Sequence, residues 1–225
     1  MKNLCLLLIF SISNILLAQD ITITKSKGKV WQKAESENFI FHFQPKHESK
    51  AVNLLQQANE SFQKNSDLLG LLPAEKIVVF VEENQPKKKS NDVIIVLNNA
   101  DHQQKMNYDI NLQLLKEMMG RKSFKKLPDW LISGAAAFAS NYQINEALAT
   151  EHSFDNLQTL TGKEATAIGI KIWHYIVQNY GEKAISDLLN LSRILANVEK
   201  GISRHWGISY QEFLQNLTRY YETQS

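Results

Sequence analysis

The sequence has a single cysteine, Cys5, and it lies within the first eighteen residues. Once that segment is removed, no cysteine remains, so the chain can form no disulfide and offers no thiol nucleophile. Zinc sites built on cysteine are excluded for the same reason. The chain must therefore fold without covalent cross-links.

Residues 1–18 have the pattern of a secretory signal peptide. Lys2 precedes an apolar run that ends in Leu-Leu-Ala directly before Gln19, which is the usual order of a charged start, an apolar core and a small-residue cleavage site. Serines and an asparagine interrupt the run, which is short beside the ~20 apolar residues of a membrane span. We therefore expect export of residues 19–225 to the periplasm, the cell exterior or the outer membrane, without an integral membrane segment. A retained N-terminal anchor is the alternative.

An excess of charge of either sign is also lacking. The formal charge is +2, or +1 once Lys2 is removed, and this balance gives no reason to expect binding to nucleic acid. The run of lysines at 87–89 is expected to be a solvated loop, which leaves contact with an acidic partner or an anionic surface open. No low-complexity linker or internal repeat divides residues 19–225, so we predict one domain.

The hydrophobic patterns predict a sheet first and helices afterwards. Short runs that alternate or are rich in β-branched residues predict strands at 38–43, 76–83 and 92–99. Helical spacing of apolar residues predicts a helix at 47–69, which Gly70 can end. A small N-terminal sheet with helices, followed by a helical C-terminal half, is an α+β arrangement.

The second half of the chain is expected to be helical, with no strand after Tyr108. Residues 98–107 are expected to be a connection. Ser209 and Glu212 form a capping box at the start of the last helix. The other helices are predicted at 109–120, 128–141, 164–180 and 182–190.

No pair of histidines has the spacing of a zinc-binding helix. The six histidines include none separated by three or four residues on one helix, so the sequence offers no local chelate. His102 beside Asp101 and His152 beside Glu151 are expected to be solvent-facing loop residues. His174 is expected to be a half-buried packing residue, and for His42, opposite a stripe of phenylalanines, solvent and a covering helix both remain open.

The segment Leu114–Phe138, LLKEMMGRKSFKKLPDWLISGAAAF, is expected to be a helix, a basic turn and a second helix that begins at Pro-Asp-Trp. Together with other runs in the same order, this segment resembles the gluzincin peptidase MA-like domain. Those runs are Trp31 before SENFIFHF, the strands IVVFV and VIIVL, the helix IWHYIVQNYGEKAISDLL and the closing GISYQEFLQNL. That domain type precedes β-propellers in some TolB-like translocation proteins. The resemblance implies a zincin-like fold over residues 19–225 and a cleft that receives an extended chain.

The resemblance also implies where a zinc site would lie. Glu117 takes the position of the general base, Lys116 and Gly120 take those of the two histidine ligands, and Ser133 takes that of the glutamate ligand. Trp130 belongs to the companion motif and is expected to pack across its helix. A lysine ammonium repels zinc, glycine has no ligand atom and serine is a poor ligand, so we expect no metal and no other cofactor.

Two functions follow from these losses. The first is a catalytically inactive zincin-like domain with a remnant cleft at Lys116, Glu117, Gly120, Trp130 and Ser133. It either binds a protein or peptide or is a subunit of an outer-membrane or secretion assembly. The second is an active secreted hydrolase, either a metallopeptidase with an atypical or misaligned metal site or an enzyme that uses Lys116 and Ser133 as a dyad. The inactive domain is the favoured interpretation.

Overall fold

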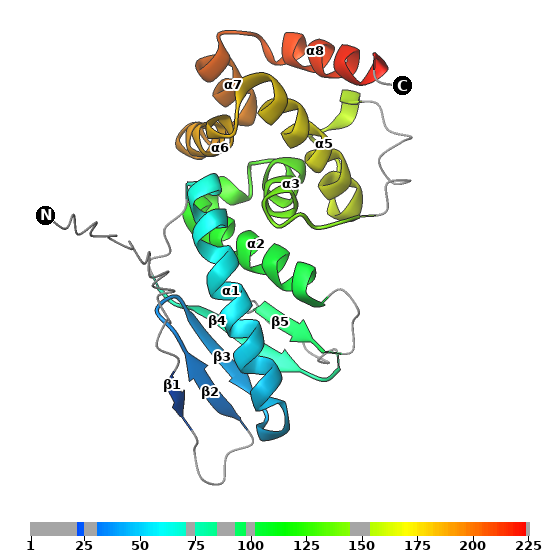
Figure 1. Ribbon diagram of the computed structural model, residues 1–225. Helices are drawn as coiled ribbons and strands as arrows, with labels where there is room; N and C mark the ends of the chain where they lie inside the picture. The colour runs from blue at the N-terminus through cyan, green and yellow to red at the C-terminus, as the bar shows by residue number, and fades with distance from the viewer. Residues whose placement is uncertain are drawn as a thin grey trace, which may run out of the picture.

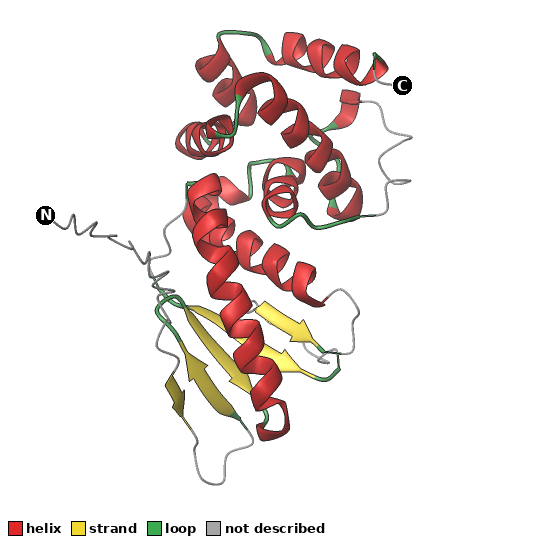
Figure 2. Ribbon diagram, viewed as in Figure 1, coloured by secondary structure: helices red, strands yellow, loops and turns green. Residues whose placement is uncertain are grey.

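The computed structural model describes residues 22–24, 31–70, 75–84, 93–97, 102–144 and 154–223, and within them it has the mixed α+β composition that the sequence predicts. The sheet lies at one end of the molecule and most of the helices at the other, with the long helix α1 (Glu48–Leu69) reaching from one to the other (Figures 1 and 2). The predicted signal peptide at 1–18 and the lysine run at 87–89 lie outside the described residues.

The described residues form a five-stranded sheet whose strands follow the order of the chain. Neighbouring strands are antiparallel from β1 to β3 and parallel from β3 to β5. The strands are β1 (Thr22–Thr24), β2 (Gln32–Glu35), β3 (Phe39–Phe43), β4 (Ile77–Glu82) and β5 (Val93–Val96). The last three strands confirm the predictions at 38–43, 76–83 and 92–99, whereas β1 and β2 were not predicted.

The alternation of side chains on β3 determines which face of the sheet is buried. Phe39, Phe41 and Phe43 are fully buried, because successive residues of a strand point to opposite faces and α1 packs on this one. His42, on the opposite face, stacks on Phe80 of β4 with ring centroids 4.9 Å apart. A neighbouring aromatic ring is thus the packing partner of His42.

Helix α2 (His102–Phe124) is longer than the predicted helix at 109–120 and contains a break. His102 therefore starts a helix, and the prediction that it lies in a loop is wrong. Gly120 has φ 67° and ψ 152°, which is outside the helical region, so the face of α2 does not continue regularly past it. The His102 side chain, Asp101 and the pair Glu151 and His152 lie outside what the structure describes.

Helices α3 (Asp129–Ala139) and α5 (Gly162–Tyr180) cross at very short distance. A Cβ atom placed on Gly134 would lie 2.5 Å from the Cα of Gly169, and one on Gly169 would lie 2.3 Å from the carbonyl oxygen of Trp130. Two glycines are thus required for the helices to pack here, which confirms the prediction that Gly134 permits close approach. The indole Nε1 of Trp173 donates to the carbonyl of Leu131 at 3.2 Å across the same crossing.

The C-terminal helices stack on α5 and α1. Ser209 caps the last helix as predicted, because its hydroxyl oxygen accepts a hydrogen bond from the backbone amide of Glu212 at 3.0 Å. The helices are α6 (Lys183–Leu195), α7 (Val198–Trp206), which was not predicted, and α8 (Tyr210–Glu222); short 3-10 turns lie at Pro45–His47 and Phe154–Asn156. Among the described helices, none combines the length and apolar character needed to cross a membrane.

Candidate functional site

Two of the residues singled out by the sequence line one cavity. Lys116 of α2 and Ser133 of α3 both border a cavity of about 350 Å³ that α2, α3 and α5 enclose. The frame inferred from the sequence therefore brings these two positions together in space. We call this space the lysine cavity, because Lys105, Lys116 and Lys163 all line it.

Neither residue is poised for nucleophilic chemistry. The Ser133 hydroxyl donates to the carbonyl oxygen of Asp129, one turn earlier in α3, at 2.6 Å. The ammonium of Lys116 lies over the ring of Phe124, 5.9 Å from its centroid. No hydrogen bond joins Lys116 to Ser133 in this described part of the chain, so the pair does not form an activated dyad here.

The other three residues of the expected site lie elsewhere. Glu117 follows Lys116 directly, so its side chain points about 100° away from that of Lys116. It is exposed on α2 and accepts a hydrogen bond from Gln113 at 2.9 Å. Gly120 is exposed at the helix break, where a Cβ atom placed on it would have open space for 4 Å around it. Trp130 is fully buried and serves the core, as its predicted packing role requires.

The walls of the lysine cavity combine apolar and polar groups. Tyr108 of α2 stacks on Tyr142 with ring centroids 4.8 Å apart, and both rings line the cavity. Burial raises the pKa of Tyr108, while a hydrogen bond with Thr166 opposes that shift. The apolar wall consists of Leu112, Phe124, Ile132 and Ile144.

Charge in the cavity is positive on balance. Lys105 is ion-paired with Asp109 at 2.5 Å, and burial raises the pKa of that carboxyl while the charge of Lys105 lowers it. Asp129 also lines the cavity and is exposed. Lys116 and Lys163 belong to no ion pair within 4 Å among the described residues, so the charges of both ammonium groups, including that of Lys116 over Phe124, are not neutralised by a directly paired carboxylate.

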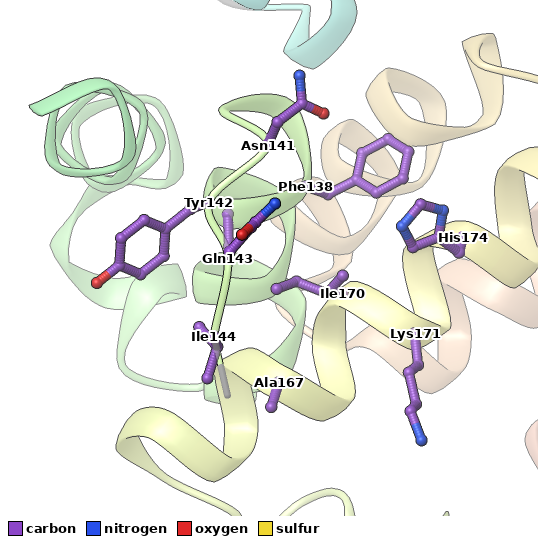
Figure 3. A pocket seen from close by; sticks show the side chains of 10 residues that line it. Phe138, Asn141, Tyr142, Gln143, Ile144, Ala167, Ile170, Lys171 and His174 are labelled. Atoms are coloured by element: carbon purple, nitrogen blue, oxygen red, sulfur yellow. The ribbon is translucent and has the colours of Figure 1, made fainter. Parts of the chain in front are cut away.

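A second, larger cavity of about 740 Å³ lies between the C-terminal end of α3, the segment 141–144 and α5. Figure 3 shows the segment running beside α5, with the side chains of Phe138 and His174 close together. Their rings meet edge to face at 4.9 Å. Burial lowers the pKa of His174, and its ring packs on Phe138 although part of the residue stays exposed, as expected for a packing histidine.

The two cavities adjoin along one face of α5. Tyr142 and Ile144 line both of them, and the α5 residues involved recur every three or four positions from Lys163 to His174. At 1.5 Å per helical residue this face is about 16 Å long. We call the two cavities together the α5 groove.

The donor atoms for a metal ion are not assembled in the groove. Across the described ranges, no group of three or more His, Cys, Asp or Glu side chains is arranged to hold one. Of the residues that line the lysine cavity, only Asp129 offers a carboxylate, and three lysines share the space with it. This donor set does not suit a zinc ion, which is bound by imidazole, thiolate and carboxylate groups.

Comparison with known proteins adds no assignment. No protein-family model matches the chain, and no curated protein matches it. The site therefore has to be interpreted from its own geometry.

Several residues of the groove were not anticipated from the sequence. Tyr108 lies on α2, whereas Phe138 lies in the last turn of α3 and Tyr142 directly after that helix, so no local spacing relates Tyr108 to the other two. The stripe from Lys163 to His174 is the one signal that the sequence contains, since these positions share a helical face. Recognising it as a groove requires knowing that segment 141–144 lies opposite.

Proposed function

We propose that this chain is an exported, catalytically inactive zincin-like domain that binds an extended protein or peptide segment in the α5 groove. The observation that carries the proposal is the groove itself, about 16 Å long and lined by aromatic rings, aliphatic side chains and lysines. An extended chain advances about 3.3 Å per residue, so about five residues of a ligand fit along it. Such a mixture of apolar surface and a few polar groups is typical of ligand sites.

The positions of the expected catalytic residues support the inactive interpretation. The surviving general-base candidate, Glu117, is exposed and bonded to Gln113, and it does not line either cavity. The ligand position Gly120 has φ 67° and ψ 152°, a backbone conformation that is essentially restricted to glycine and disfavours a histidine there. A base without a metal-bound water has no nucleophile to activate.

The location rests on residues 1–18, whose pattern is that of a signal peptide. Membership of an outer-membrane or secretion assembly rests on the resemblance to domains of TolB-like translocation proteins. Both are proposals about the cell, and gentle extraction of the tagged protein from its native envelope tests them. Recovery of the protein alone, as a monomer, would count against the assembly.

A site-specific crosslinking experiment tests peptide binding. Gln143 is exposed and lines the larger cavity, while Gln211 is exposed on α8 and lines neither. A photoreactive phenylalanine analogue at position 143 should crosslink to hexapeptides from a random pool, and the same group at position 211 should not. Equal labelling at both positions, or labelling at neither, would contradict the proposal.

An active hydrolase is the second candidate, and the observation that favours it is the shared cavity of Lys116 and Ser133. Mass spectrometry of the same peptide pool after incubation distinguishes it. Cleavage products that are formed by the protein and are lost in Ser133→Ala would establish the hydrolase. An intact pool is the result expected for a binding domain.

A further inference from the structure

The lysine cavity contains two features that point to one kind of ligand. Lys116 and Lys163 approach it from different helices, and neither belongs to an ion pair within 4 Å among the described residues. Two ammonium groups on separate walls favour an anion between them, since charge-assisted hydrogen bonds to a carboxylate are the strong ones. Lys105 contributes less, because Asp109 already pairs with it, whereas Lys116 acts on that carboxyl only through its charge and donates no hydrogen bond to it.

The second feature is the apolar wall. Leu112, Phe124 and Ile132 line the same cavity as the lysines, and Leu112 and Phe124 keep part of their surface exposed. The cavity has a volume of about 350 Å³, so an apolar group and an anionic group of one ligand must lie within a few ångströms of each other to occupy it together. The exposed carboxylate of Asp129 on the same cavity disfavours a ligand with several negative charges.

We infer that the lysine cavity binds the C-terminal residue of a peptide or protein, with a large apolar side chain against Leu112, Phe124 and Ile132 and the α-carboxylate between Lys116 and Lys163. In a C-terminal residue the side chain and the carboxylate leave the same Cα atom. In an extended chain, an internal acidic residue and its apolar neighbour point to opposite faces, so they do not enter one small cavity together. This inference rests on the proposed function, since it names the end of the segment that the α5 groove binds.

The arrangement also sets the direction of the bound chain. The lysine cavity lies at the N-terminal end of α5, whose first residue, Gly162, lines it. The larger cavity continues along α5 toward His174. Residues preceding the C-terminus would therefore run along segment 141–144 with the ligand antiparallel to α5. The positive end of the α5 dipole adds to the attraction of the two lysines for the carboxylate.

Fluorescence anisotropy with a labelled test peptide, Ala-Ser-Gly-Thr-Ala-Phe, measures this preference. The peptide with a free C-terminus should bind at least about tenfold more tightly than its C-terminal amide, because the amide loses a charge-assisted hydrogen bond. Lys116→Gln and Lys163→Gln should each remove most of that difference. Lys125→Gln is the matched control, since Lys125 is exposed and does not line the cavity, and it should bind as the unchanged protein does.

The outcomes separate this inference from the proposed function. The amide and a peptide with an internal Glu-Ala-Phe are compared with the free acid. If both bind as tightly as the free acid and also crosslink to position 143, the groove binds peptides but the C-terminal inference is overturned. If decanoate binds and the peptide acid does not, the cavity takes a free fatty acid and the inference is overturned as well. Failure of every peptide to bind, with no crosslink at position 143, overturns both proposals. Thermal unfolding of each lysine variant shows whether a loss of binding reflects a loss of fold.

Discussion

Alanine at Gly169 should separate the two helices that form the walls of the groove. The new Cβ atom would lie 2.3 Å from the carbonyl oxygen of Trp130 and 2.7 Å from the Cα of Gly134. Carbon atoms pack at about 3.5–4.0 Å, so α3 and α5 must move apart by about 1 Å. Overpacking usually costs about 1–3 kcal/mol, and here it costs about 3 kcal/mol because the contacts are with backbone atoms that cannot rotate away. The better helix propensity of alanine returns about 1 kcal/mol.

We therefore expect Gly169→Ala to lower the free energy of unfolding by about 2 kcal/mol, which corresponds to a decrease of about 4–8 °C in Tm for a chain of this size. Urea unfolding followed by circular dichroism measures the change, and near-ultraviolet signals report on the buried indoles of Trp130 and Trp173. Gly201→Ala is the control, because the nearest atom to its Cβ is the side-chain oxygen of Ser192 at 2.7 Å. The decrease in the free energy of unfolding should be smaller for Gly201→Ala than for Gly169→Ala.

A variant Gly169→Ala that is as stable as the unchanged protein would refute the close crossing of α3 and α5. Because Ser133 and Thr166 of the lysine cavity stand on those helices, that result would also remove the basis for the shape of the groove. A loss of stability without a change in the tryptophan signals would indicate that the strain lies elsewhere.

Three further substitutions or titrations test other parts of the structure. Ser209→Ala removes the side-chain cap of α8 and should cost about 1 kcal/mol in urea unfolding; an unchanged midpoint would contradict the cap. Hydrogen bonds from Lys33 and then Lys76 lower the pKa of Glu35 from 4.5 to about 2, so its stabilising effect is present above pH 4.5 and is lost as pH falls toward 2. Tm measured over that range should fall less steeply in Lys76→Met, and equal slopes would exclude the ion pair. Burial raises the pKa of Tyr210 to about 12, above the ordinary value of about 10. The contribution of its neutral hydroxyl to the stability of the fold is therefore complete below pH 10 and is lost as pH rises through 12. The phenolate absorbance that disappears in Tyr210→Phe should titrate near 12, and a midpoint near 10 would show that the ring is not buried.

Elements defined by local periodicity were predicted correctly. Phe39, Phe41 and Phe43 alternate, and Ser209 with Glu212 marks a helix start, so the sequence alone was sufficient to place β3 and α8. Strand β2 has the polar sequence QKAE and is a strand because Ala34 pairs with Phe41 across the sheet. Such pairing is a tertiary effect that a local pattern does not contain.

The candidate site was predictable in part. Lys116 and Ser133 line one cavity, and the order of α2 and α3, which carry them, is visible in the sequence. The resemblance also groups Glu117 with them, although adjacent residues on a helix diverge by about 100°. The predicted helix at 109–120 ends at Gly120, the residue where α2 breaks, whereas the helical residues that continue to Phe124 were not predicted.

The central claim is that the α5 groove binds a peptide without a metal and without cutting it. Anisotropy titration of the labelled hexapeptide in EDTA and again with added zinc, followed by mass spectrometry of the peptide, tests this claim most directly. The account predicts saturable binding with the same Kd in both solutions and an intact peptide at the end. Binding that requires zinc, or a cleaved peptide, would contradict it.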